Sequence, residues 1–168
     1  MNKMNAYIID LKRSDVTGKD FHTHEDNSFF EYFKGDIEQG ELDTTIHVEG
    51  TGRVFNLNIH SEGTVHVPCD RCLADMVLRI DTTNDLVVKF GTEYMDEGDY
   101  VIVPEDEGTI DMAPLVYEFV ALSMPIKRVH EPGMCDPAMM EILNQHLADR
   151  SNLEDDLDDT DTMADDDE

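Results

Sequence analysis

The residues best suited to chemistry are three cysteines and one histidine, which fall in two short stretches of the chain. Residues 67–73 (VPCDRCL) contain Cys69 and Cys72 as a C-x-x-C pair, and His130 lies five residues before Cys135. Two thiolates at this spacing on a tight loop can point at one ion, which is why zinc knuckles use it. A structural zinc site needs four ligands, and the two stretches together predict a tetrahedral Cys3His set.

Two other interpretations of these residues stay open. The 57 residues between Cys72 and His130 carry no spacing information, so the cysteines can equally be three reduced thiols, with His130 in a loop. A thioredoxin-like redox pair is disfavoured because no βαβ pattern surrounds the motif. An odd number of cysteines without a secretory signal argues against a disulfide framework.

No second catalytic motif accompanies the cysteines. The sequence has no nucleophile elbow, no P-loop, no H-E-x-x-H and no glycine-rich dinucleotide turn. His22 and His24 stand beside acids, where a solvated loop is the favoured interpretation and a metal site the other. We therefore predict a protein that is not an enzyme; the alternative is a zinc- or thiol-dependent enzyme that uses Cys69 and Cys72.

The middle of the chain has the two-residue alternation and glycine turns of antiparallel strands. Residues 43–49 and 53–60 alternate, a turn is expected at Glu62-Gly63, and 64–67 continues toward the cysteines. Residues 76–90 predict one long bent strand or a hairpin. Shorter strands are expected at residues 7–11 and at residues 100–103.

Helical spacing appears at both ends of this β region. A short helix is predicted at 26–33 after an Asp26 or Asn27 cap. Residues 111–123 carry a stripe of Leu115, Phe119 and Leu122, with Val116 and Val120 beside it, and Pro125 ends that helix. Asp136-Pro137 begins another helix over 137–147. Its stripe consists of Met139, Ile142, Leu143 and Leu147.

These elements predict an α+β fold, a curved antiparallel sheet of five to seven strands with both C-terminal helices packed on it. One domain is expected over residues 1–150. Residues 151–168 predict a disordered acidic tail, because aspartate repeats with few apolar residues cannot repay the entropy of ordering.

Charge and hydropathy restrict the partners and the compartment. The formal net charge is −27, and residues 154–168 hold ten acids and no base. An acidic surface repels phosphate backbones and cannot supply counterion release, so broad RNA binding is not expected and a basic protein partner fits better. No apolar run reaches the roughly 20 residues of a membrane helix and no signal peptide is evident, so we expect a cytoplasmic protein.

The order of motifs resembles the YceD family of large ribosomal RNA subunit accumulation proteins. Residues 67–73 match its V-x-C-x-R-C-L motif. Residues 110–118 (IDMAPLVYE) and 122–126 (LSMPI) are similar to its I-D-L…L-V-x-E…L-x-L-P helix. His130 and Cys135 fall where members carry a histidine or cysteine and then a cysteine. The resemblance spans roughly residues 45–147.

The resemblance implies a role in accumulation of large-subunit rRNA without a known catalytic activity. Ala138 stands where some members complete a second C-x-x-C, which leaves His130 as the fourth ligand here. An acidic member is expected to act through a basic ribosomal protein or an rRNA-processing factor. Direct RNA contact would be limited to a small patch of bases, namely Arg71, Arg79, Lys89, Lys127 and Arg128.

Overall fold

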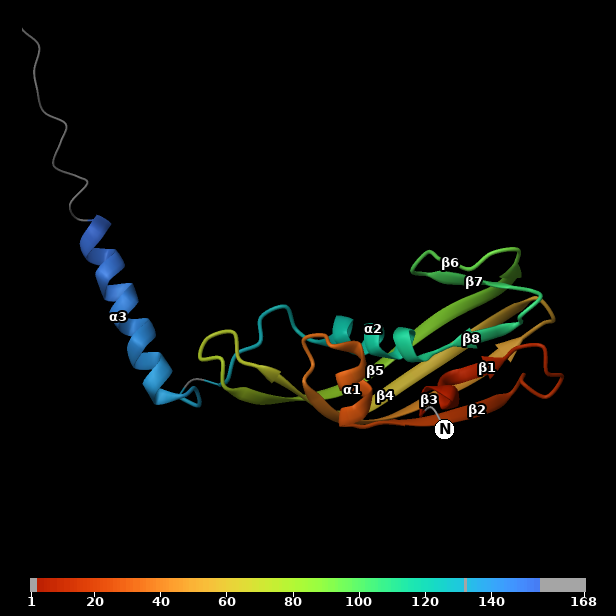
Figure 1. The fold of residues 1–168 in the computed structure, drawn as a ribbon, viewed down its shortest axis with the longest axis horizontal. Helices are drawn as coiled ribbons and strands as arrows, with labels where there is room; N and C mark the ends of the chain where they lie inside the picture. The colour runs from red at the N-terminus through yellow and green to blue at the C-terminus, as the bar shows by residue number, and fades with distance from the viewer. Residues whose placement is uncertain (1–2, 132, 155–168) are drawn as a thin grey trace, which may run out of the picture.

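The computed structural model describes residues 3–131 and 133–154, and it has a mixed α+β fold built on one large open sheet (Figure 1). The elements follow in the order η1 (Lys3–Tyr7), β1 (Ile8–Asp10), β2 (Lys19–Glu25), α1 (Asn27–Phe33), β3 (Gln39–Gly50), β4 (Val54–Pro68), β5 (Asp75–Gly91), β6 (Met95–Asp96), β7 (Tyr100–Pro104), β8 (Thr109–Asp111), α2 (Ala113–Ser123) and α3 (Pro137–Glu154). No helix within the described ranges is both long and apolar enough to cross a membrane.

The large sheet has the strand order β2-β3-β4-β5-β7-β6, and β1 pairs with β8 in a separate two-stranded ribbon. All pairs in the large sheet are antiparallel except β5–β7, which is parallel. The expected antiparallel sheet is therefore confirmed with one exception. The exception arises because β6 and β7 form a hairpin in which β6 is the outer strand. Strand β7 therefore lies beside β5 and runs in the same direction as β5.

The core lies on one face of the sheet. Along β3 and β4 nearly every second residue is buried, as the alternation predicts for a sheet with one solvated face. The helices α1 and α2 and the β1–β8 ribbon lie over the buried face (Figure 1). Phe30 of α1 and Val116 and Val120 of α2 are fully buried there.

The turn expected at Glu62-Gly63 is wrong, because β4 continues without interruption from Val54 to Pro68. Gly63 pairs with Leu42 on one side and Ile80 on the other, so it lies in the middle of three strands. Its φ is +148°, and a Cβ there would lie 2.2 Å from the carbonyl oxygen of Glu41. Glycine is needed at this position for close approach of two strands, not for a turn. Residues 76–90 likewise form one strand, β5, and not a hairpin.

Helices α1 and α3 begin where their sequences predict, whereas α2 begins at Ala113 with Met112 as its N-cap instead of Asp111, and it buries a different face from the one predicted. Asp26 accepts a hydrogen bond from the Ser28 amide as the N-cap of α1, and Pro125 directly follows the Met124 C-cap of α2. In α2 the predicted stripe is partly wrong, because Leu122 is 73% exposed while Val116 and Val120 are buried. The row of α2 that contains Val116 and Val120 therefore faces the sheet.

The position of α3 also differs from the expectation. Figure 1 shows it extending away from the end of the sheet, and of its described side chains only Met139 and Met140, in the first turn, pack against the core. Ile142 and Leu147 are 48% and 63% exposed. Of the two C-terminal helices, only α2 therefore packs on the sheet as expected. The helix continues to Glu154, into the first residues of the expected tail, and 155–168 lie outside the described residues.

Candidate metal centre

Cys69 and Cys72 lie in the tight loop that joins β4 to β5. The Cys69 amide donates to the Ala74 carbonyl at 2.9 Å, and the Leu73 amide donates to the Cys69 carbonyl at 2.9 Å. Leu73 takes a left-handed conformation with φ +62°, which closes the loop. The Arg71 amide donates to the Cys69 sulfur at 3.4 Å. These bonds turn both thiols toward the same side of the loop.

His130 and Cys135 come from the segment between α2 and α3, which is fastened to the cysteine loop through Asp70. The Asp70 amide donates to the Arg128 carbonyl at 2.7 Å, and the Arg128 amide donates to the Asp70 carboxylate at 2.8 Å. His130 Nε2 lies 3.1 Å from the Asp75 carbonyl oxygen, which leaves Nδ1 directed at the sulfurs. Two segments 58 residues apart are thus held side by side.

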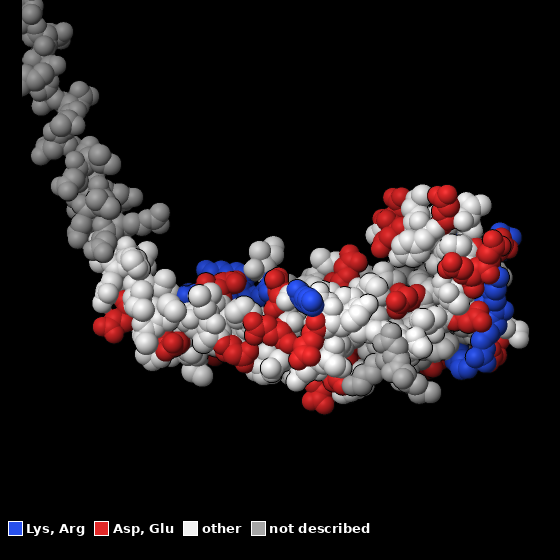
Figure 2. All heavy atoms as spheres, in the orientation of Figure 1, with Lys and Arg blue, Asp and Glu red and all other residues white. Residues whose placement is uncertain are grey.

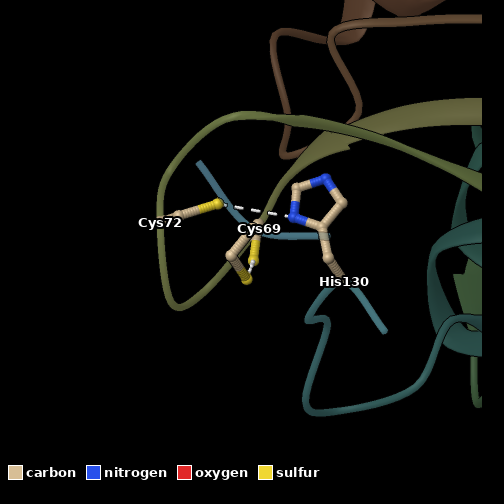
Figure 3. A group of neighbouring side chains, drawn as sticks. Cys69, Cys72 and His130 are labelled. Atoms are coloured by element: carbon tan, nitrogen blue, oxygen red, sulfur yellow. Dashed lines mark hydrogen bonds between the residues drawn. The ribbon is translucent and has the colours of Figure 1, made fainter. Parts of the chain in front are cut away.

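The four side chains converge on one point. The ligand atoms of Cys69, Cys72, His130 and Cys135 all lie within 4.8 Å of one another. Cys69 Sγ is 4.0 Å from Cys135 Sγ, and Cys72 Sγ is 3.4 Å from His130 Nδ1. Figure 3 marks the contact between Cys72 and His130 with a dashed line. A tetrahedron with Zn–S bonds of about 2.3 Å has edges of about 3.8 Å. The predicted set is therefore brought together at a separation that fits a tetrahedral ion.

The surroundings of the two loop cysteines favour their thiolate forms. Burial raises the pKa of Cys69, but backbone N–H groups, first that of Cys72, stabilise the thiolate and bring its pKa down to about 6. For Cys72, burial also acts upward, and the backbone N–H groups of Asp136 and Ala74 outweigh it, so that its pKa is lowered. A thiolate is the form that binds a metal ion.

The other two ligands hold their protons more tightly. The bond to the Asp75 carbonyl, together with the neighbouring sulfurs, raises the pKa of His130. Burial and the two neighbouring sulfurs raise the pKa of Cys135. A metal ion must displace both protons, so its affinity for this group falls as the pH falls.

All three thiols are free and buried, with Cys69 fully covered and Cys72 2% exposed. Reactive and redox cysteines need access to solvent or substrate. The arrangement therefore suits ligation by four protein groups better than attack on a substrate. A hollow of about 600 Å³ lies elsewhere, between η1, β2 and α1, and no cysteine lines it.

The remaining histidines do not sit in loops. His22 and His24 belong to β2 and are exposed, so the loop expected there is wrong. A further group that could hold an ion, His60, Glu62 and Asp81, lies on the solvated face of the sheet. Sequence reasoning missed it because only the β4–β5 register brings Glu62 opposite Asp81.

A comparison with protein families decides the relationship of this chain. The model of "Large ribosomal RNA subunit accumulation protein YceD" matches residues 57–166, which is well over half of the chain and includes all four converging ligands. The chain belongs to the YceD family. This confirms the resemblance, and it extends the match beyond residue 147 through α3. No curated protein and no solved structure matches the chain.

Buried Glu25 is a second feature of this YceD-family fold that its sequence did not indicate. Its side chain is fully covered and accepts hydrogen bonds from the hydroxyls of Tyr7, Thr23 and Thr44, at 3.1, 2.7 and 2.7 Å. Burial raises the pKa of Glu25, and the hydroxyl donors act in the opposite direction with less effect. The group joins η1 to β2 and β3, so its role is structural.

Proposed function

We propose that this YceD-family protein is a non-enzymatic accessory factor for the accumulation of large-subunit rRNA, and that it acts by binding a protein partner. The observation that supports the role is the family match over residues 57–166. A role in ribosome assembly requires the compartment where ribosomes form, which we take to be the cytoplasm.

We further propose that Cys69, Cys72, His130 and Cys135 hold one structural zinc ion. The donor set fits this ion, because three sulfurs and one imidazole nitrogen lie at tetrahedral spacing with both loop cysteines favoured as thiolates. Four protein ligands leave no coordination position for water, so the bound ion would supply cross-linking and no Lewis-acid chemistry. This argues against the enzyme that the Cys69–Cys72 pair otherwise suggests.

The charge supports a protein partner, either a basic ribosomal protein or an rRNA-processing factor. The net charge of −27 opposes contact with RNA over a broad surface. On the face in Figure 2, Lys and Arg gather in two groups with acidic surface between them. Arg128 has only 20% of its side chain exposed and lies 3.6 Å from Asp36, which leaves it little suited to contact RNA beside the metal centre.

Affinity purification of the tagged protein, with and without ribonuclease, tests this mode of action. We expect basic proteins of the large subunit or its processing machinery to co-purify in both cases, because the contact is between proteins. If rRNA and its proteins co-purify only when ribonuclease is left out, the contact runs through RNA. That result would contradict a direct protein contact.

A further inference from the structure

The solvated face of the large sheet is formed by the outward side chains of β2, β3, β4 and β5, and we call it the open face. Residues alternate between buried and exposed along β3 and β4, and the buried positions all point toward α1, α2 and the core. In the described part of the chain, helices pack only on the opposite face. The open face is thus a long, uncovered surface four strands wide.

Carboxylates dominate this face. Its outward positions hold eight of them: Asp20, Glu41, Asp43, Glu49, Glu62, Asp75, Asp81 and Asp85. The same positions hold two cations, Arg79 opposite Thr64 and Lys89, whose ammonium group lies over the Tyr100 ring. Within the described residues, every Lys or Arg that pairs with a carboxylate does so outside the open face.

The centre of the face carries a row of like charges. Asp43 lies directly opposite Glu62, and Glu62 lies directly opposite Asp81, on three adjacent strands. Like charges in directly opposite positions of a sheet are destabilising. Histidines contact the row: His24 bonds to Asp43 at 2.8 Å, and His60 lies 3.7 Å from both Glu62 and Asp81. Arg79 lines the same shallow hollow as Asp43 and Glu62 without forming an ion pair with either within 4 Å. A row that costs stability and pairs with no Lys or Arg among the described residues is complementary to cations from outside.

We propose that the open face docks a Lys- and Arg-rich segment of a partner protein, with the Asp43–Glu62–Asp81 row at its centre. The existence of a basic protein partner rests on the proposed function, and the docking surface is the new element. Neighbouring strands lie about 4.8 Å apart and outward residues along a strand about 7 Å apart, so one cationic side chain can contact two carboxylates.

The acidic residues of 154–168 compete with the open face for any basic ligand. The test must therefore identify which carboxylates the ligand contacts. The probe is a ten-residue peptide of alternating lysine and serine, added to the full-length chain at 0.15 M salt, where charges beyond about 8 Å are screened. Carbodiimide then joins lysine amines directly to the carboxylates that they touch. We expect cross-links on Asp43, Glu62 and Asp81. Cross-links confined to 154–168 would overturn the proposal.

Two triple variants separate docking on the open face from general attraction to an acidic protein, since each removes three exposed negative charges. The first is Asp43→Asn, Glu62→Gln, Asp81→Asn on the row. The matched control is Glu93→Gln, Glu97→Gln, Asp99→Asn around β6.

We expect the peptide Kd, measured by fluorescence anisotropy, to rise about tenfold in the first variant and less than twofold in the control. Equal weakening in both would overturn the proposal. The wild-type cross-linking result decides the matter if the first variant fails to fold. If depletion of the protein lowers large-subunit rRNA but the peptide avoids the open face, docking fails alone. If the peptide binds there and rRNA is unaffected, the proposed function fails alone.

Discussion

Cys135 supplies the third sulfur of the proposed zinc site and, like His130, comes from the segment between α2 and α3. Its sulfur lies 4.0 Å from that of Cys69, and its neighbour Asp136 begins α3. The C-x-x-C loop alone offers two ligands, which is too few for a closed site. If zinc binds as proposed, the stability of the junction between the β4–β5 loop and the helices depends on this residue.

Replacing Cys135 with serine should remove the metal. Wild-type protein is expected to contain about one zinc per chain by elemental analysis, and Cys135→Ser about none, because hydroxyl oxygen is a poor ligand for zinc beside thiolates. His22→Asn, a change on an exposed strand, should retain the metal. Wild-type protein purified without a metal ion, or full zinc content in Cys135→Ser, would contradict the Cys3His assignment.

Glu25 gives a second prediction for a single residue, because its pKa is raised by burial. A carboxyl group in the unfolded chain loses its proton near pH 4.3. As the pH rises, Glu25 loses its proton in the unfolded chain before it does so in the folded protein. Its ionisation therefore stabilises the unfolded chain relative to the folded protein until the pH passes the raised pKa. Glutamine does not titrate. The unfolding free energy of wild type relative to Glu25→Gln should therefore fall as the pH rises above about 4.3, and level off once the raised pKa of Glu25 is passed.

Urea denaturation of both proteins across this pH range measures that difference. All other titrating groups are shared, so their contributions cancel in the comparison. A difference that stays constant, or that moves in favour of wild type as the pH rises, would show that Glu25 does not carry a raised pKa in the folded protein.

Among the elements, β4 depends most on a single backbone position. Gly63 has φ +148°, and an added Cβ would lie 2.2 Å from the Glu41 carbonyl oxygen of β3. We expect Gly63→Ala to lower the unfolding free energy by about 2–5 kcal/mol, from backbone strain together with steric overlap. Gly52→Ala is the matched control, because Gly52 has φ +74° and open space around it. It should cost about 1 kcal/mol. Equal losses in chemical denaturation would show that strand contact is not the cause.

The elements also show where sequence patterns are sufficient and where they are not. The two-residue alternation predicted β3, β4 and β5, because each has one buried face. Gly63 was misread as a turn, since a glycine chosen for close strand contact has the same sequence signature as one chosen for a bend. The parallel β5–β7 pair and the exposed stripe of α3 had no local signal, because both depend on which elements meet in space.

The proposed metal centre, like the strands and helices, could be predicted from the sequence only in part. The spacing of Cys69 and Cys72 is a local signature, whereas the approach of His130 and Cys135 depends on the path of the chain through β5 to α2. The family motifs supplied what spacing could not. Nothing in the sequence indicated the buried carboxylate of Glu25 or the row of Asp43, Glu62 and Asp81, because strand register alone decides which acids are covered and which lie side by side.

At the scale of the whole molecule, the charged groups are distributed unevenly. The acidic open face lies on the side of the sheet away from the helices α1 and α2, and the metal centre lies at the end of the sheet from which α3 extends (Figure 1). The open face reaches this end at Asp75, but the Asp43–Glu62–Asp81 row lies six residues further along β4 and β5, so a partner on the row does not need to contact the proposed metal ligands. This arrangement is compatible with the proposed binding role, in which the metal would stabilise the fold.

The ratio of large-subunit to small-subunit rRNA in cells depleted of this protein tests the central claim most directly. We expect the ratio to fall as the protein disappears and to recover when the wild-type chain is expressed again, because the family is described by accumulation of large-subunit rRNA. An unchanged ratio in cells shown to lack the protein would contradict a role in large-subunit rRNA accumulation.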